Sequence, residues 1–296
     1  MSNSVSTKTH SEDNRASDNY HPSYSFPSAD IVLLSNDGVK FRVHSSILAT
    51  ASKFFHDMFG MPRSAAENPD DALPMGESSK VISTLLDIIY PHDADPFLPS
   101  VSFKFLRRLL TSAEKYDLAR VNHYVRLLTK TEPFLSRPLE VYALACTFGW
   151  DEDTHKLSLQ TLNVDLSSPA YVDVLKSMDS ASLHKILQLR WEIKGEVLKV
   201  VQKFEDADIS EMWGCGCSEA GDLVSTDDYE FFENFIRSEL DKYPDGSSLR
   251  CQRFWYDGLE RLWDIKCHQC DKPVLERRGV ETAVISALDQ IHFKYN

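Results

Sequence analysis

The segment from Asp30 to Phe59, which reads DIVLLSNDGVKFRVHSSILATASKFFHDMF, constrains the fold more than any other part of the chain. Its first apolar run, residues 31–34, is too short for a helix and is typical of a strand buried on both faces. Asn36-Asp37-Gly38 predicts a tight turn, because glycine tolerates positive φ. From Val39 to Val43 apolar and polar residues alternate, which predicts a second strand with one face toward a core.

Two short helices are predicted directly after this hairpin, with Ser45 and Ser52 as their N-caps. Ala72–Met75 is predicted as a short edge strand, since Pro74 cannot donate a hydrogen bond to a neighbouring strand. Apolar spacing predicts further helices at 78–90, 103–116 and 121–128. A β-hairpin that leads into a helical hairpin without a catalytic group at the junction indicates a packing unit.

This order of elements resembles the BTB/POZ domain, a protein–protein interaction fold. The resemblance rests on the aspartate that opens the first strand, on Phe-x-Val-His at 41–44 and on Ser-x-x-Phe at 52–55. It continues to Leu118 through the sequences LDIIY and AEKYDL. The resemblance implies an α+β domain over residues 28–130 that self-associates as a homodimer.

Length and charge restrict the remaining possibilities. A chain of 296 residues has room for about two domains. With 32 Lys and Arg against 45 Asp and Glu, its net charge of −13 argues against broad nucleic-acid binding. Its densest basic spots, Arg107-Arg108 and Arg277-Arg278, are too small to change that expectation.

Targeting and catalytic motifs are absent from the sequence. The first residues lack the apolar core of a signal peptide, and no apolar run approaches the roughly 20 residues that span a bilayer. The expected location is therefore the cytosol or nucleus, with reduced cysteines and no membrane contact. Without a phosphate loop, a nucleophile elbow or a His-Glu-x-x-His pattern, the protein is predicted not to be an enzyme, with no catalytic or cofactor-binding residues. An enzyme remains the competing class.

The polarity of the chain predicts its domain organisation. Residues 1–27 are polar and without periodicity, which predicts a disordered tail. After the domain at 28–130 and a proline-containing linker at 132–138, residues 138–296 are expected to be all-helical and resemble the helical BACK region that follows many BTB domains. Helical spacing is present at 138–150, 169–176, 180–189 and 192–204. The loop PHDADPFLPS and the sequences AEKYDL and VYALACTFGW together resemble the expanded BTB group of basidiomycete fungi.

Two cysteine pairs suggest a metal site in the C-terminal part. Cys215 and Cys217 lie in MWGCGC, and Cys267 and Cys270 lie in KCHQC. Four thiolates together would form a structural zinc site, and the fungal group often carries a tryptophan-associated cysteine pair and a later Cys-x-x-Cys.

Two other interpretations of the cysteines remain open. The pairs are incidental in the first, and Cys146 and Cys251 are core thiols. In the second, Cys267 and Cys270 are a redox pair, although such motifs normally begin a helix beside a βαβ pattern.

Two positions bear on the best-known uses of the BTB fold. His44 is expected to be a satisfied core histidine. Asp30 matches an acidic position that, in BTB transcription factors, pairs with a basic residue just after the histidine. That basic position is Ser45 here, and the sequence lacks tandem zinc fingers. A role as a transcriptional co-regulator is therefore less favoured than the two functions given in the next paragraph.

BTB proteins that recruit a cullin often carry a hydrophobic-x-Glu motif after the third helix. Here that loop, His92–Ser100, has no glutamate. Met75-Gly76-Glu77 matches the motif but precedes the third helix. Phe97 and Leu98 on this stiff loop could anchor a partner or pack on the helix at 103–116. The predicted function is an interaction module that self-associates and presents its helical domain to a protein partner. A substrate adaptor for a cullin-type ubiquitin ligase is the alternative.

Overall fold

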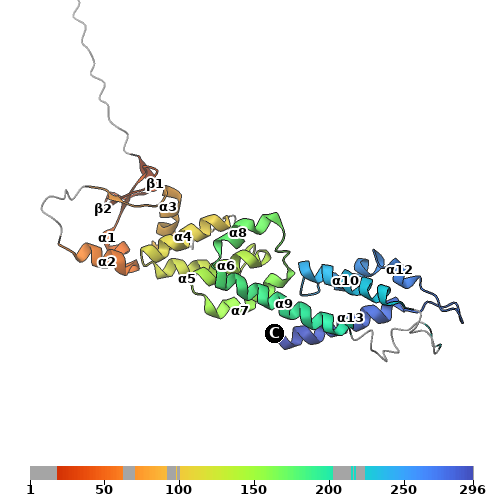
Figure 1. Ribbon diagram of the computed structural model, residues 1–296. Coiled ribbons are helices and arrows are strands. Elements are labelled where there is room, and N and C mark those ends of the chain that lie inside the picture. Colours follow the sequence, from red (N-terminus) through yellow and green to blue (C-terminus); the bar gives the residue numbers. More distant parts are fainter. Residues whose placement is uncertain are drawn as a thin grey trace, which may run out of the picture. The chain divides into compact units, whose positions relative to one another are not determined.

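The computed structural model describes residues 19–62, 71–91, 98, 101–202, 215, 217 and 224–295. The chain divides into two compact units, Met1–Leu128 and Thr129–Asn296. Figure 1 shows the helices and strands of both units. In the ranges given above, every helix is too short or too polar to cross a bilayer.

A mixed four-stranded sheet organises the N-terminal unit. Its order is β1-β3-β2-β4, with the strands β1 (Tyr20–Ser25), β2 (Ile31–Leu34), β3 (Lys40–Val43) and β4 (Leu73–Pro74). The predicted hairpin is confirmed, because β2 and β3 pair antiparallel across a turn in which Gly38 has a φ of +82°. β4 pairs parallel with β2 at the edge of the sheet, as the proline in it requires.

Strand β1 corrects the tail prediction. Residues 1–18 lie outside the described residues, but Tyr20–Ser25 forms a strand that pairs parallel with β3. The polar sequence YHPSYS carries no alternating apolar pattern, and contacts with residues far away in the sequence hold this strand in place. Tyr24 is buried and donates a hydrogen bond to Asp87, and the His21 ring stacks on Phe41.

Burial of β2 also differs from the prediction. Leu33 is fully buried, whereas Ile31, Val32 and Leu34 are only half-buried. The face that carries Val32 and Leu34 is therefore only partly covered.

Five helices of the described residues complete the N-terminal unit: α1 (Ser45–Ala51), α2 (Lys53–Gly60), α3 (Ser79–Ile89), α4 (Phe103–Lys115) and α5 (Ala119–Leu128). Ser52 caps α2 as predicted, since its Oγ accepts a hydrogen bond from the Phe55 amide. The prediction for Ser45 was wrong, because His44 occupies the N-cap of α1 without a side-chain bond. Ser45 instead donates from its amide and its hydroxyl to the carboxylate of Asp30, at 2.8 and 2.5 Å.

The described C-terminal unit is helical: α6 (Pro138–Thr147), α7 (Asp151–Gln160), α8 (Val172–Ser177), α9 (Ser180–Gln202), α10 (Thr226–Lys242), α11 (Gln252–Tyr256), α12 (Glu260–Trp263) and α13 (Arg277–Tyr295), with short 3-10 turns at Phe134–Ser136, Thr161–Asn163, Pro169–Tyr171 and Ser248–Arg250. The helices predicted at 180–189 and 192–204 are one helix, α9, through Gln202. Arg190 interrupts the apolar pattern but is buried, and its guanidinium donates to the carbonyls of Thr161 and Lys242. A charged residue satisfied by carbonyls thus continues the helix where the pattern indicated a break.

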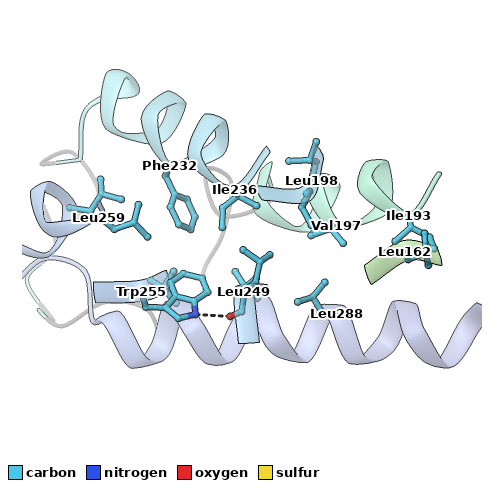
Figure 2. Close-up of a cluster of buried hydrophobic side chains, with 14 residues drawn as sticks. Leu162, Ile193, Val197, Leu198, Phe232, Ile236, Leu249, Trp255, Leu259 and Leu288 are labelled. Atoms are coloured by element: carbon cyan, nitrogen blue, oxygen red, sulfur yellow. Dashed lines mark hydrogen bonds between the residues drawn. The ribbon is translucent and has the colours of Figure 1, made fainter. Parts of the chain in front are cut away.

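The main core of this unit lies among α9, α10, α11 and α13. Figure 2 shows Phe232 and Ile236 of α10 pointing toward the side on which Leu288 of α13 lies. Trp255 is fully buried and its indole N–H donates to the carbonyl of Leu249 at 2.8 Å (Figure 2). The polar atom of the largest core side chain is therefore satisfied within the core.

Candidate metal centre

Four cysteines from two distant segments lie together in the C-terminal unit. The Sγ atoms of Cys215, Cys217, Cys267 and Cys270 all lie within 4.8 Å of one another, and those of Cys215 and Cys270 are 3.3 Å apart. A zinc ion with four Zn–S bonds of about 2.3 Å in tetrahedral geometry requires sulfurs about 3.8 Å apart. The four thiols are thus spaced as a tetrahedral ion would need.

A tight hairpin holds the Cys267 and Cys270 pair. Lys266 bridges antiparallel to Pro273, and the amide of Cys267 donates to the carbonyl of Lys272 at 2.9 Å. Asp271, just after the second cysteine, closes the turn with a φ of +57°, a conformation that aspartate tolerates better than most residues. The pair therefore projects from the tip of a hairpin, which is the shape of a zinc knuckle.

Sequence reasoning did not predict this hairpin. Its signal was the Asp-Lys-Pro that follows Cys270, because aspartate suits the left-handed position and proline ends the pairing.

Backbone amides prepare one of the thiols for metal binding. The amides of Gln269 and Cys270 hydrogen-bond to Cys267 and lower its pKa to about 6. Because the thiolate is the form that binds metal, this sulfur is poised to act as a ligand near neutral pH.

The thiols of Cys215 and Cys217 retain their protons more strongly, because their pKa values are raised. Hydrogen bonds with Cys215, Cys270 and Cys267 raise the pKa of Cys217 to about 12. Several thiolates at such short range repel one another, and a divalent cation would offset that repulsion.

The surroundings of the four cysteines contain little apolar material. Cys215 and Cys267 are buried with Val224 and Val274 in a small cluster, next to the partly buried Tyr229, Ile265 and Leu275. Cys217 is half-buried and Cys270 is exposed. Burial alone is therefore a weak source of stability here, and the four-sulfur donor set fits a structural zinc ion.

The two alternative interpretations of the cysteines fare differently. Cys251 is exposed before α11 and Cys146 is half-buried, so the core-thiol prediction was wrong for Cys251. The Cys267–Cys270 pair lies on a hairpin and not at the start of a helix, which does not favour the redox interpretation.

The remaining residues singled out in the sequence lie in the N-terminal unit. His44 is satisfied but only half-buried, with Nε2 3.0 Å from the Ser28 hydroxyl and Nδ1 3.3 Å from that of Tyr90. Glu77 bonds Lys115 and the hydroxyl of Tyr116, which is a structural use of this residue. Phe97 lies outside the described residues and Leu98 is half-buried, so the partner-anchor prediction stays a prediction.

The mixed sheet with its two helical hairpins agrees with a family comparison. The family model of the BTB/POZ domain matches residues 25–132. Residues 25–132 form a BTB/POZ domain. The chain is also similar to the BTB/POZ and MATH domain-containing protein 6 of Arabidopsis thaliana, with 26% identity over 187 residues. That alignment covers 58% of this chain and 42% of the relative, so the chain spans less than half of the relative's length.

Proposed function

We propose that this protein is an interaction module that self-associates through its BTB/POZ domain and presents its helical C-terminal unit to a protein partner. The BTB/POZ match over residues 25–132 carries the proposal, because this domain implies protein–protein interaction. BTB/POZ proteins are generally adaptors without enzymatic activity. The helical unit resembles the BACK region, and its four clustered cysteines support kinship with the basidiomycete BTB group.

Exposed apolar side chains at helix α2 support self-association. Phe54 is 42% exposed and Met61, the residue that follows the helix, is 62% exposed. Large apolar side chains that remain in water near one another often mark a protein interface.

The mass of the purified protein in solution tests self-association. Light scattering at micromolar concentration is expected to give twice the chain mass of 33.7 kDa. Met61→Asp is expected to weaken the dimer at least tenfold, because it buries an unpaired charge in the interface. The matched control is Val172→Asp, an exposed valine at the start of α8 in the other unit. A monomer of the unmodified protein at this concentration would contradict the proposal.

The helical unit is proposed to bind one structural zinc ion through Cys215, Cys217, Cys267 and Cys270. The distances among the four sulfurs and the hairpin around Cys267 support this assignment. Protein purified under reducing conditions is expected to contain about one equivalent of zinc, and Cys267→Ser to contain far less. Cys251→Ser, an exposed cysteine outside the cluster, is the control that keeps the metal. Metal-free protein with a normal fold and reduced thiols would end this assignment.

A substrate adaptor for a cullin-type ubiquitin ligase is the second candidate, because adaptors are the general role of BTB/POZ proteins. A pull-down with the N-terminal domain of a cullin distinguishes the two functions. A stable equimolar complex would support the adaptor role. The absence of a complex would favour the self-associating module.

A further inference from the structure

A groove in the BTB/POZ domain lies between α4 and the loop that leads into α3. Its volume is about 680 Å³, within the range of ligand sites, and Gly76–Ser78 form one wall. Lys104, Arg107, Arg108 and Thr111 of α4 form the other. The three cationic residues among them include Arg107-Arg108, the basic pair that the sequence analysis judged too small to bind nucleic acid.

The three basic side chains lie on one side of α4 and have no acidic partner among the residues that the structure describes. Lys104 is followed by Arg107 and Arg108 at helical spacings of three and four residues, which places them on one side of α4. Within the part of the chain that the structure describes, none of the three has a carboxylate oxygen within 4.0 Å. The acid that lines the groove, Glu77, is already bound to Lys115 and Tyr116. The groove therefore has cations in excess.

The charge of the rest of the chain makes this excess notable. Residues 1–128 carry 13 Lys and Arg against 15 Asp and Glu, whereas residues 129–296 carry 19 against 30. In so acidic a protein, three neighbouring unpaired cations concentrate positive potential at one place. Three charges are too few to hold a nucleic-acid backbone against the repulsion of the whole chain.

Carboxylates suit this groove because the guanidinium group presents paired N–H donors in a planar fork. The hydroxyl of Ser78 makes no capping bond to α3, and Thr111, which also lines the groove, is exposed. We propose that this groove binds an acidic segment of a protein partner, whose Asp and Glu side chains pair with Lys104, Arg107 and Arg108. The inference rests on the proposed role as an interaction module and adds the chemistry of the partner.

Fluorescence anisotropy on the full-length protein tests this inference. The probe is a labelled twelve-residue peptide in which glutamates alternate with glycine and serine, and the reference is the same peptide with glutamine. The glutamate peptide is expected to bind at low salt at least tenfold more tightly than the reference. Its binding should weaken as the salt concentration rises, because the pairs are exposed to solvent.

Charge reversal localises the binding. Arg107→Glu with Arg108→Glu is expected to weaken binding at least tenfold. The matched control is Lys53→Glu with Lys185→Glu, which changes the net charge equally at exposed lysines away from the groove. Equal loss in both variants would show a general charge effect and overturn the inference.

Two further outcomes separate this inference from its alternatives. A phosphoserine peptide of the same spacing that binds tenfold more tightly than the glutamate peptide would overturn the carboxylate assignment. The dimer is measured by light scattering on the same samples. If the protein is a monomer and binds the acidic peptide, the proposal of self-association fails and the groove proposal stands. If it is a dimer that does not bind the peptide, the groove proposal fails and self-association stands.

Discussion

The two units of this protein differ in what holds their segments together. The BTB/POZ domain closes its core with a sheet and helices in which Phe41, Val43 and Leu109 are completely buried. The C-terminal unit has an equally well-buried core around Trp255, but its second cluster consists of two cysteines and two valines. Hydrophobic burial accounts for the first unit, whereas the second cluster of the C-terminal unit buries little apolar surface and, if the proposed zinc ion binds, is held by bonds between sulfur and metal.

Metal removal should produce the largest difference between the units. Structural zinc contributes about 10–16 kcal/mol in small zinc-binding peptides. Chelation with EDTA is therefore expected to abolish amide-exchange protection in the hairpin Ile265–Val274. The amides of β2 and β3 should exchange at unchanged rates, because no cysteine of the cluster lies in that unit. Equal changes in the exchange rates of both units would contradict the prediction that the ion stabilises only the C-terminal unit.

Two glycines with positive φ test how tightly each unit is packed. A Cβ at Gly246 would lie 2.5 Å from a methyl group of Leu288, which is itself fully buried, so Gly246→Ala combines backbone strain with overpacking. We expect a loss of about 2–4 kcal/mol in the free energy of unfolding. Gly38→Ala meets no atom within 4 Å and should lose only about 1–2 kcal/mol, from backbone strain alone. Denaturant unfolding measures both, and equal losses would show that the C-terminal core yields to the added methyl group.

A third pair compares the pH dependence of two aspartates, one in each unit, that accept hydrogen bonds at the start of a helix. Asp228 is buried, and hydrogen bonds from Ser225 and the charge of Arg261 lower its pKa. Asp30 is exposed, and its hydrogen bonds with Ser45 lower its pKa. At pH 7 we expect Asp228→Ala to cost about 1–2 kcal/mol and Asp30→Ala about 0.5–1 kcal/mol, since solvent screens the exposed carboxylate of Asp30.

The sign of the pH effect follows from the lowered pKa values. A carboxyl group whose pKa is lower in the folded state stabilises the protein above its unfolded pKa of about 3.9. That contribution is lost as the pH falls through the folded pKa. The difference between each variant and the unmodified protein should therefore shrink below about pH 4. A difference that stays constant down to pH 2 would show that the carboxylate charge contributes nothing.

Local pattern predicted much of the BTB/POZ domain. The alternation that places Phe41 and Val43 inside is an intrinsic property of a strand, and the cap at Ser52 needs only its own helix. Gly38 marks the turn for the same reason. Each of these features depends on residues a few positions apart, so the sequence alone is sufficient.

Features that depend on distant partners were harder to predict. Strand β1 is fixed by Phe41 and Asp87, and Ser45 meets Asp30 across fifteen positions. The continuity of α9 depends on carbonyls at Thr161 and Lys242, which no window around Arg190 reveals.

The grouping of the four cysteines was predicted from chemistry and resemblance and not from spacing. Their residue types suited one ion, but the chain between the two pairs gave no measure of their separation. The hairpin that orients Cys267 and Cys270 became visible only in the structure.

The distance along the chain between the two cysteine pairs has a mechanical consequence. About 50 residues lie between Cys217 and Cys267, among them helices α10, α11 and α12. With the proposed ion bound, this stretch is a closed loop, and tension applied at the chain ends passes through the metal–sulfur bonds without extending it. Rupture of the metal–sulfur bonds would release about 175 Å of chain, at about 3.5 Å per extended residue. A single metal ion would thus determine the force at which this length of chain becomes extensible.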